Sequence, residues 1–270
     1  MLAIIDGDVL AYGACRSRWQ DKVQDNVRVR ELDENGNEKP LDFSRKEDQM
    51  YLQECWQNVQ TNLDKLLGTV FCDEYLMAVK GVGNFRDLIY HDYKANRAKN
   101  VRNVNLFVPT LRKLMVKSEL AIEAHGREAD DMLRIWAEQA RQAGKEYVIC
   151  SIDKDLKCIP GKHYLMHKEI MVDVSESEAM RHYYEQLLKG DPTDNIPGVP
   201  RVGEVKAAKI LAPFNTEEEF QEQVVEQYLI AYGEEHWKHY LLANGKMIHL
   251  QRDVADYFSF FDWPIIEELM

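Results

Sequence analysis

Residues 147–155 read YVICSIDKD, a short apolar run that predicts a buried strand and that Asp153 and Asp155 follow at once. Residues 2–8, LAIIDGD, have the same form, with Asp6 and Asp8 after the apolar residues. Because runs of this kind alternate with stretches of helical periodicity, we expect an α/β fold with a mostly parallel sheet flanked by helices. The carboxyl ends of such strands face one crevice, so these aspartates should lie close together.

The remaining pattern predicts further elements. Strands are expected at residues 75–79, 120–124 and 164–167, and helices at residues 45–67, 107–118, 129–143, 204–211 and 216–240, with Gly68 as the C-cap of the first helix. Residues 27–40 contain Asn35-Gly36 and predict an inserted β-hairpin, and the polar residues 82–104 predict a long loop or arch. A Pro- and Gly-rich segment begins at residue 190, so we divide the chain into residues 1–188 and 189–270.

Composition excludes several classes of protein. The 270 residues are 45% hydrophobic and 30% charged, which is typical of a globular chain. The sequence has no apolar run long enough for a membrane span and no signal-like start, so we expect a cytoplasmic protein. The 5 cysteines form no C-x-x-C pair, which favours reduced thiols over disulfides or a zinc site.

More carboxylates stand at two other positions. Glu128, Asp130 and Asp131 open a predicted helix, where capping alone would explain them, and Asp191 and Asp194 lie in a segment where turns favour aspartate. If all of these side chains share one crevice, they repel each other and require a compensating cation. Hard divalent ions such as Mg²⁺ prefer oxygen ligands, and carboxylate-held metals beside basic residues indicate chemistry on phosphates.

The charge distribution qualifies the net charge of −12, which by itself argues against a nucleic-acid partner. Basic residues dominate the stretch from Lys80 to Lys117, as either a solvated helix face or a strip that binds phosphates. Within it, residues 93–97 read YKANR, whose Lys94 and Arg97 would share one face of a helix. The segment IPGVPRVG, residues 196–203, precedes a helix that carries Lys206; its backbone N–H groups could bind a phosphate, or it is an ordinary turn.

Together these motifs resemble the bacteriophage-type flap endonuclease and 5′→3′ exonuclease family, which is related to the 5′-nuclease domain of bacterial DNA polymerase I. The resembling pieces run in the family's order over about residues 2–210. They are IDGD (5–8), Phe85-Arg86, YKANR (93–97), GREADDM (126–132), SIDKD (151–155) and KGDPTDNIPGV (189–199), continued by Arg201, Val202 and Gly203.

The resemblance implies a PIN-like 5′-nuclease core in residues 1–188, an arch over the active site, and a helical subdomain of helix-hairpin-helix type in residues 189–270. It implies two Mg²⁺ ions, for which Mn²⁺ can substitute, and K⁺ at the hairpin. The first Mg²⁺ would be held by Asp6, Glu128, Asp130 and Asp131, and the second by Asp153, Asp155, Asp191 and Asp194, with Asp8 outside the site. Catalytic roles would fall to Lys94, Arg97, Asp6, Asp130 and Asp155. Contacts with DNA would come from Arg86, Tyr93, Lys94, Arg97, Gly198, Val199, Arg201, Gly203 and Lys206.

One departure from the family concerns the end of the second strand. The family usually has a metal-site aspartate there, but residues 78–86 read AVKGVGNFR, with no carboxylate between Val79 and Gly81. We therefore expect a weakened first metal site.

The expected function is hydrolysis of phosphodiesters near DNA 5′ ends, such as flaps or duplexes with a single-stranded 5′ tail. The setting would be replication, primer removal or repair in a bacterial or phage-infected cell, by a monomer that replication proteins can accompany. Two alternatives remain open: a nuclease that acts on RNA–DNA hybrids, and a protein that binds DNA structures without cleaving them.

Overall fold

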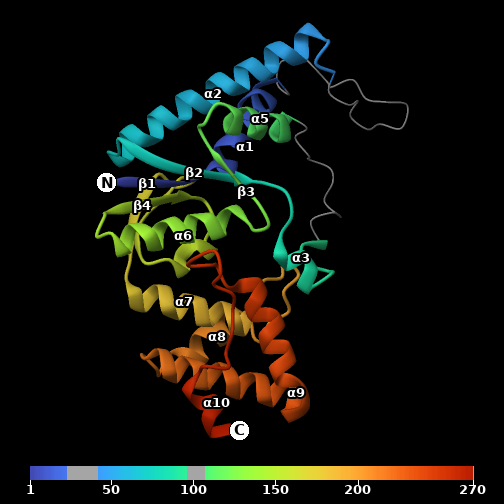
Figure 1. The fold of residues 1–270 in the computed structure, drawn as a ribbon, viewed down its shortest axis with the longest axis vertical. Coiled ribbons are helices and arrows are strands. Elements are labelled where there is room, and N and C mark those ends of the chain that lie inside the picture. The colour runs from blue at the N-terminus through green and yellow to red at the C-terminus, as the bar shows by residue number, and fades with distance from the viewer. Residues whose placement is uncertain (23–41, 96–106, 270) are drawn as a thin grey trace.

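A computed structural model describes residues 1–22, 42–95 and 107–269 (Figure 1). The predicted hairpin at residues 27–40, the second part of the predicted arch and Arg97 lie outside these residues. In the described part of the chain, no helix has both the length and the apolar character that crossing a bilayer requires.

A six-stranded sheet forms the centre of the fold, with the strand order β3-β2-β1-β4-β5-β6. Its strands are β1 (Leu2–Asp6), β2 (Glu74–Lys80), β3 (Ile122–Ala124), β4 (Tyr147–Ser151), β5 (Gly161–Leu165) and β6 (Ile170–Val174). All neighbouring strands pair in parallel except β5 and β6, which are antiparallel. The mostly parallel α/β sheet that the sequence predicts is therefore confirmed.

The prediction at residues 164–167 was wrong in detail, because those residues span the end of β5 and the turn into β6. That turn contains Glu169 with a φ of 54°. Strand β6 lies at the edge of the sheet and its residues are exposed or half-buried. It therefore lacks the continuous apolar run by which the buried strands are recognised.

The helices surround the sheet and form the C-terminal region. They are α1 (Gly7–Lys22), α2 (Lys46–Val70), α3 (Phe85–Ile89), α5 (Phe107–Lys117), α6 (Ala129–Gln142), α7 (Glu176–Lys189), α8 (Glu204–Leu211), α9 (Glu217–Ile248) and α10 (Pro264–Leu269), with a 3₁₀ turn at Asp155–Cys158. Helix α2 continues past Gly68 to Val70, and its C-cap is Phe71, whose φ is 55°, so Gly68 is not the C-cap. Helix α9 is broken at Gly233, where φ is 73°.

Alternation along β1 shows how the sheet builds two cores. Ala3 and Ile5 belong to the cluster under α1, α2 and α5, whereas Leu2 and Ile4 belong to the cluster under α6. Successive residues of a strand point to opposite faces, so one apolar run supplies both clusters. Figure 1 shows α2, α1 and α5 above the sheet and α6 below it.

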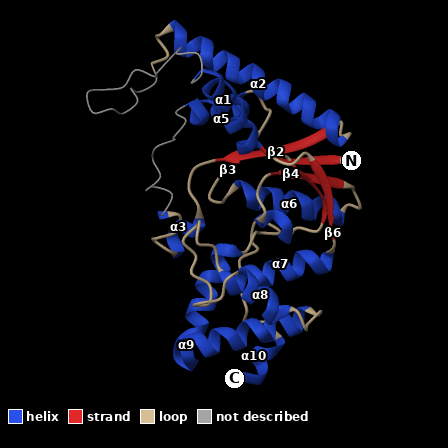
Figure 2. Ribbon diagram, turned by 180° about the vertical axis from the view of Figure 1, so that it is seen from behind, coloured by secondary structure: helices blue, strands red, loops and turns tan. Residues whose placement is uncertain are grey.

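A third cluster joins α7, α8, α9 and α10, which lie together beyond α6 (Figure 2). Helix α7 packs against α8 and α9, and its residues Tyr184, Leu187 and Leu188 are buried in this cluster. The structure thus builds the C-terminal core from α7 onward, whereas the sequence boundary after residue 188 follows composition alone.

Candidate functional site

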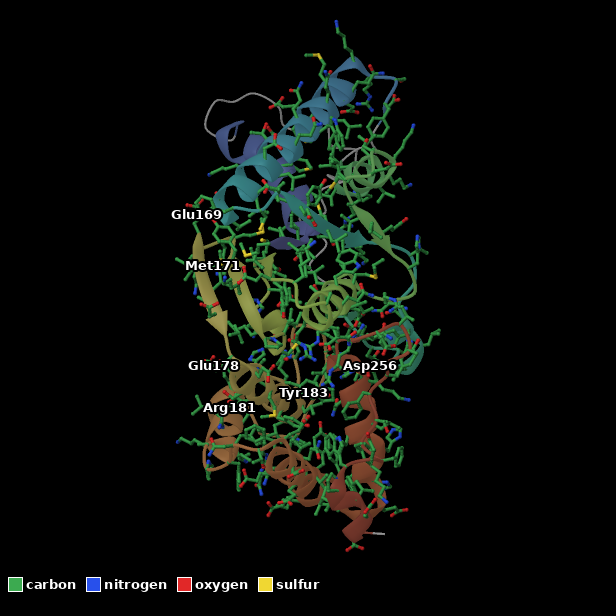
Figure 3. The ribbon with its side chains drawn as sticks, turned by 60° about the vertical axis from the view of Figure 1, so that its left-hand side comes forward. Glu169, Met171, Glu178, Arg181, Tyr183 and Asp256 are labelled. Carbon is green, nitrogen blue, oxygen red and sulfur yellow. The ribbon has the colours of Figure 1, made fainter. Side chains whose placement is uncertain are left out.

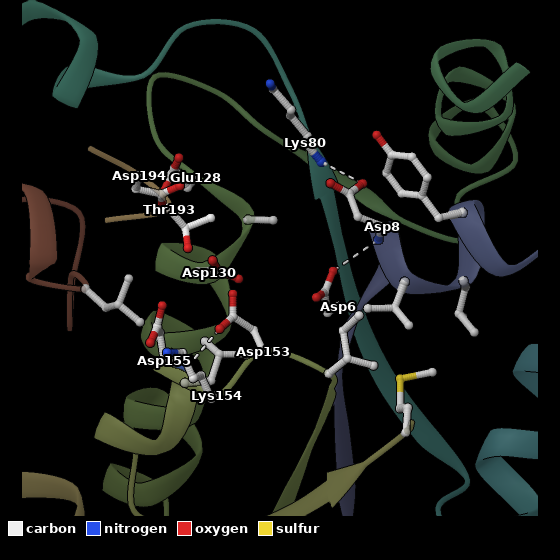
Figure 4. Close-up of a pocket in the computed structure, with 18 of the residues that line it drawn as sticks. Asp6, Asp8, Lys80, Glu128, Asp130, Asp153, Lys154, Asp155, Thr193 and Asp194 are labelled. Atoms are coloured by element: carbon white, nitrogen blue, oxygen red, sulfur yellow. Dashed lines mark hydrogen bonds between the residues drawn. The ribbon is translucent and has the colours of Figure 1, made fainter. Parts of the chain in front are cut away.

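One large cavity opens at the carboxyl ends of β1, β2 and β4, with a volume of about 1370 Å³. The carboxylates that line it are Asp6, Asp8, Asp87, Glu128, Asp130, Asp153, Asp155, Glu169, Asp191 and Asp194. Figure 4 shows Glu128 and Asp194 on one side, Asp6 and Asp8 on the other, and Asp130 and Asp153 between them. The fold thus brings together carboxylates that are widely separated in the sequence.

Asp6 is fixed by groups on both sides of its strand end. The Asp8 backbone N–H donates to one of its oxygens at 3.2 Å, and the Ser151 hydroxyl donates to the other at 2.9 Å. Ser151 is the last residue of the neighbouring strand β4, and its hydroxyl also accepts from the Asp153 N–H at 3.0 Å. Sequence reasoning missed Ser151, although its place directly before the two aspartates of SIDKD was a usable signal.

Asp153 and Asp155 lie in the turn that follows β4. The Asp155 N–H donates to Asp153 Oδ1 at 2.8 Å, which orders the turn as the 3₁₀ segment begins. Both side chains line the cavity, as their place after a buried strand predicts.

Glu128 is the N-cap residue of α6, and its carboxylate accepts hydrogen bonds from residues of the predicted arch. Its carboxylate accepts from Asn84 Nδ2 at 3.0 Å and from the Tyr93 hydroxyl at 3.0 Å, and it forms an ion pair with Lys94. Asn84 also caps α3 by accepting from the Arg86 N–H at 3.1 Å. Sequence reasoning did not single out Asn84, which stands directly before Phe85-Arg86.

Lys94 lies on the cavity wall among the carboxylates. Besides Glu128, its ammonium is 3.5 Å from Asp194 Oδ2, and its backbone N–H donates to the Asp194 carbonyl at 2.9 Å. Its φ of 58° is a left-handed conformation that residues with a Cβ rarely adopt. The structure therefore places the ammonium group of the predicted catalytic lysine in contact with two of the predicted metal ligands.

Carboxylates crowded in the cavity raise one another's pKa. Burial, together with the nearby Asp8, raises the pKa of Asp6 from 3.8 to about 6. Burial, together with Asp153 and Asp191, raises the pKa of Asp155 to about 6. Burial and the charges of Asp6 and Asp153 hold the pKa of Asp130 well above its usual range. Burial and like charge are the causes expected for carboxylates crowded in a low-dielectric site.

We expect Asp6→Asn to stabilise the metal-free protein at high pH. The folded-state pKa of Asp6 lies above its unfolded value, so the wild type loses stability as pH rises from about 4 through 6. In buffer with a chelator, the variant should gain about 3 kcal/mol in free energy of unfolding at pH 8, and the difference should vanish below about pH 4. Urea unfolding at both pH values measures this effect, with the exposed Asp173→Asn as control. Equal stabilities of variant and wild type at pH 8 would contradict the raised pKa.

Arg86 and Asp131, both predicted site residues, do not face the cavity. Arg86 and Asp131 are both 0% exposed, and two hydrogen bonds of 2.6 and 2.9 Å join the guanidinium to the carboxylate. The prediction that Arg86 contacts DNA is therefore wrong, because its side chain is sealed inside the protein. Asp131 is likewise not among the cavity carboxylates, because both of its oxygens accept hydrogen bonds from Arg86.

The predicted DNA contacts of Tyr93 and Val199 also have to be corrected, because both side chains are buried. Tyr93 is 7% exposed and packs in the C-terminal cluster, so its ring is not available to stack on a base. Val199 is 4% exposed in the same cluster, which leaves only its backbone for contact with DNA.

Asp8, expected outside the site, lines the cavity. Its Oδ1 accepts from Arg112 Nε at 2.7 Å and from the Lys80 N–H, at the end of β2, at 3.3 Å. Asp8 thus places a carboxylate beside the strand end where the sequence lacks one.

The Gly-rich segment after α7 folds as a tight loop. Gly190 and Gly198 have φ values of 67° and 60°, and a Cβ on Gly198 would lie 2.3 Å from the Gly190 nitrogen. Glycine is required at both positions by this backbone contact. The loop leaves Arg201, Gly203 and Lys206 exposed near the start of α8.

The donor set suits a hard divalent cation, because the cavity presents many carboxylate oxygens. Within residues 1–22, 42–95 and 107–269, however, no three acidic, histidine or cysteine side chains lie close enough together to hold one ion. The residues fit such a cation by chemistry, and binding would require the carboxylates to draw together around it.

A mostly parallel sheet with an acidic cavity at its carboxyl edge, followed by a helical region, defines the class of PIN-like α/β proteins. Within this class the chain belongs to the family of 5′-3′ exonucleases, whose N-terminal resolvase-like domain matches residues 46–189.

Two curated relatives illustrate the similarity. DNA polymerase I of Bacillus caldotenax is 34% identical over 152 residues, which are 51% of this chain and 17% of the polymerase. A 5′-3′ exonuclease of Aquifex aeolicus is 29% identical over 143 residues, 49% of this chain and 50% of that protein. The chain thus spans half or less of the length of these relatives.

Solved structures share the fold at low sequence identity. The T5 5′-exonuclease with divalent zinc ions bound has a TM-score of 0.55 at 14% identity, and the match covers 92% of this chain and 94% of that one. The bacteriophage T5 flap endonuclease in a complex with DNA and metal ions has a TM-score of 0.53 at 14% identity over the same shares of the two chains.

Proposed function

We propose that this protein is a divalent-metal-dependent, structure-specific 5′ nuclease that hydrolyses phosphodiesters near DNA 5′ ends. The observation that carries the proposal is the cavity at the carboxyl edge of the sheet, where crowded carboxylates meet the ammonium group of Lys94. An acidic site beside a lysine suits a reaction in which cations and a protein cation together face a phosphate.

The metal sites that we propose assign the cavity carboxylates to two ions. Asp6, Glu128 and Asp130 would hold one Mg²⁺, and Asp153, Asp155, Asp191 and Asp194 would hold the second, with Mn²⁺ as a substitute. When bound, such ions lower the pKa of a coordinated water and stabilise the leaving oxygen. The T5 5′-exonuclease that shares this fold was solved with divalent zinc ions, which supports the assignment.

Side chains of the protein would orient the metal-binding carboxylates and neutralise charge on the reacting phosphate. Ser151 holds the Asp6 carboxylate from the neighbouring strand. Lys94, with Arg97, would offset negative charge that develops on the reacting phosphate. Exposed Arg201 and Lys206, with the backbone of Gly198 and Gly203 and a bound K⁺, would hold duplex phosphates away from the cavity.

A non-cleaving DNA-structure-binding protein is the second candidate, favoured by one observation. Lys80, not a carboxylate, ends β2 at the cavity, so the first metal site lacks one acidic ligand from that strand. The nearby Asp8 carboxylate, which accepts from Lys80, argues that metal binding is retained.

Incubation of the full chain with Mg²⁺ and a 5′-flap DNA labelled at the 5′ end tests the proposal. Cleavage near the flap junction or the 5′ end, absent with a matched 3′-flap and abolished by chelator, is the expected result. Tight binding without cleavage in Mg²⁺ or Mn²⁺ would refute the enzyme and leave the DNA-binding candidate. A flap with an RNA 5′ end distinguishes DNA from RNA–DNA hybrid substrates.

A further inference from the structure

The buried guanidinium of Arg86 connects three separate segments. Arg86 belongs to α3, at the start of the predicted arch, and donates to both oxygens of Asp131 in the first turn of α6. Its Nε donates to the Met247 carbonyl at 2.8 Å, and one Nη donates to the His249 carbonyl at 2.6 Å. The two carbonyls belong to the end of α9, far away in the sequence.

Asp131 extends these connections to the cavity wall. It accepts from the Glu128 N–H at 2.9 Å and from the Gln251 N–H at 3.2 Å. Glu128 and Asp130, its neighbours in the same helical turn, both line the cavity. The Arg86–Asp131 pair therefore fixes the turn that presents two proposed metal ligands against residues 247–251.

Residues 247–251 are themselves held in place. His249 Nε2 is 2.9 Å from Asp256 Oδ2, which also accepts from the Arg252 N–H at 2.8 Å. Tyr257 packs edge-on against Phe85, the residue before Arg86, at 5.2 Å between ring centroids. Figure 3 shows Asp256 where the C-terminal segment meets the rest of the chain. These contacts hold in place the segment whose carbonyls accept from Arg86.

A fully buried ion pair is weak evidence for a stabilising role, because removing two charges from water offsets most of their attraction. Its value lies in geometry, since a bidentate arginine–carboxylate pair fixes both distance and orientation. Here, that geometry is imposed directly behind Glu128 and Asp130.

We infer that Arg86 and Asp131 are a positioning pair for the metal centre. Through this pair, the end of α9 sets the placement of Glu128 and Asp130, although neither Arg86 nor Asp131 faces the cavity. The C-terminal helical region thus contributes to metal affinity as well as to the binding of DNA. The inference rests on the proposed metal-dependent function.

Mn²⁺ binding to the full-length chain, followed by electron paramagnetic resonance, tests the pair in Arg86→Lys and Asp131→Asn. Lysine cannot make the bidentate contact with Asp131. In Asp131→Asn, the amide NH₂ would face an N–H group that now donates to an Asp131 oxygen. Each variant should bind Mn²⁺ about 10- to 100-fold more weakly, as changes to groups behind metal ligands do. On a 5′-flap DNA at fixed Mg²⁺, kcat should fall while KM for DNA changes less than about twofold.

Arg181→Lys is the matched control. Arg181 Nη groups donate to the Leu211 and Phe214 carbonyls, each at 2.7 Å, so this arginine also joins elements through backbone carbonyls. Figure 3 shows it away from Asp256, on the other side of the C-terminal helices. The control should lose thermal stability yet keep its Mn²⁺ affinity within about twofold.

The outcomes separate this inference from the proposed function. Wild-type Mn²⁺ affinity in folded Arg86→Lys or Asp131→Asn, or equal losses in Arg181→Lys, would overturn the positioning role while leaving the nuclease intact. If the wild type binds Mn²⁺ but cleaves no DNA, and Asp131→Asn still weakens binding, the nuclease fails and the positioning role stands. If Arg86→Lys shows no cooperative unfolding, it is not folded, and the Mn²⁺ affinity of Asp131→Asn alone tests the positioning role.

Discussion

Asp155→Asn is expected to reduce 5′-end hydrolysis by about 10³-fold. Asp155 is partly buried in the acidic cavity, where burial and its neighbours Asp153 and Asp191 raise its pKa to about 6. The amide keeps the shape of the side chain and its backbone hydrogen bond to Asp153, but it cannot supply a charged ligand. Losing that ligand removes several kcal/mol of charge stabilisation, at tenfold in rate for each 1.36 kcal/mol.

Single-turnover cleavage of a 5′-flap DNA measures the effect of Asp155→Asn, and a gel-shift assay in Ca²⁺ measures DNA affinity separately. Affinity should stay within about threefold, because the variant removes negative charge and no phosphate contact. Asp173→Asn, at an exposed carboxylate on β6, is the control and should cleave at the wild-type rate. A rate for Asp155→Asn within tenfold of the wild type would show that Asp155 is not a metal ligand.

Lys94→Ala is expected to lower the single-turnover rate by about 10²- to 10³-fold, the usual effect of removing one group that stabilises developing charge. In the structure the Lys94 ammonium pairs with Glu128 and Asp194, so it already lies beside the proposed metal ligands. The variant should bind Mn²⁺ at least as tightly as the wild type, because a cation that competes for these carboxylates is gone. This separates Lys94→Ala from Arg86→Lys, which should weaken Mn²⁺ binding.

Salt dependence gives a second measurement on Lys94→Ala. If Lys94 contacts a phosphate, the slope of log affinity against log salt concentration should decrease by about 1. Lys145→Ala is the matched control, because Lys145 also pairs with a carboxylate, Glu74, but near the amino ends of the strands. Its rate and its slope should match the wild type. An unchanged rate in Lys94→Ala would remove Lys94 from the mechanism.

The distribution of charge explains how DNA can be the proposed partner of a chain with a net charge of −12. In the proposed site, carboxylates gathered in one cavity would attract cations, and those cations would face the phosphate backbone. Arg201 and Lys206 are exposed outside the cavity, so their own positive charges can face phosphates without a metal ion. Net charge alone is therefore a poor guide to the partner of a protein whose acidic residues form a metal site.

Much of the fold follows from local pattern. The apolar runs at residues 2–5 and 147–151 predict β1 and β4, because burial on both faces of a parallel sheet requires continuous apolar residues. The aspartates that follow these runs reach the same crevice, because parallel strands end at the same edge. Strand β6 and helix α7 were missed, since edge exposure and a polar helix face give weaker signals.

Neighbouring Asp130 and Asp131 show what the sequence by itself determines and what it leaves open. The sequence sets a carboxylate-rich helix start after a strand, and there the two residues look equivalent. Successive helical residues point about 100° apart, so only one of them can face the cavity. Asp130 faces it, while Asp131 is directed to Arg86 and Gln251. Only the tertiary structure decides this, because Arg86 and residues 247–251 reach Asp131 only when the distant segments have packed together.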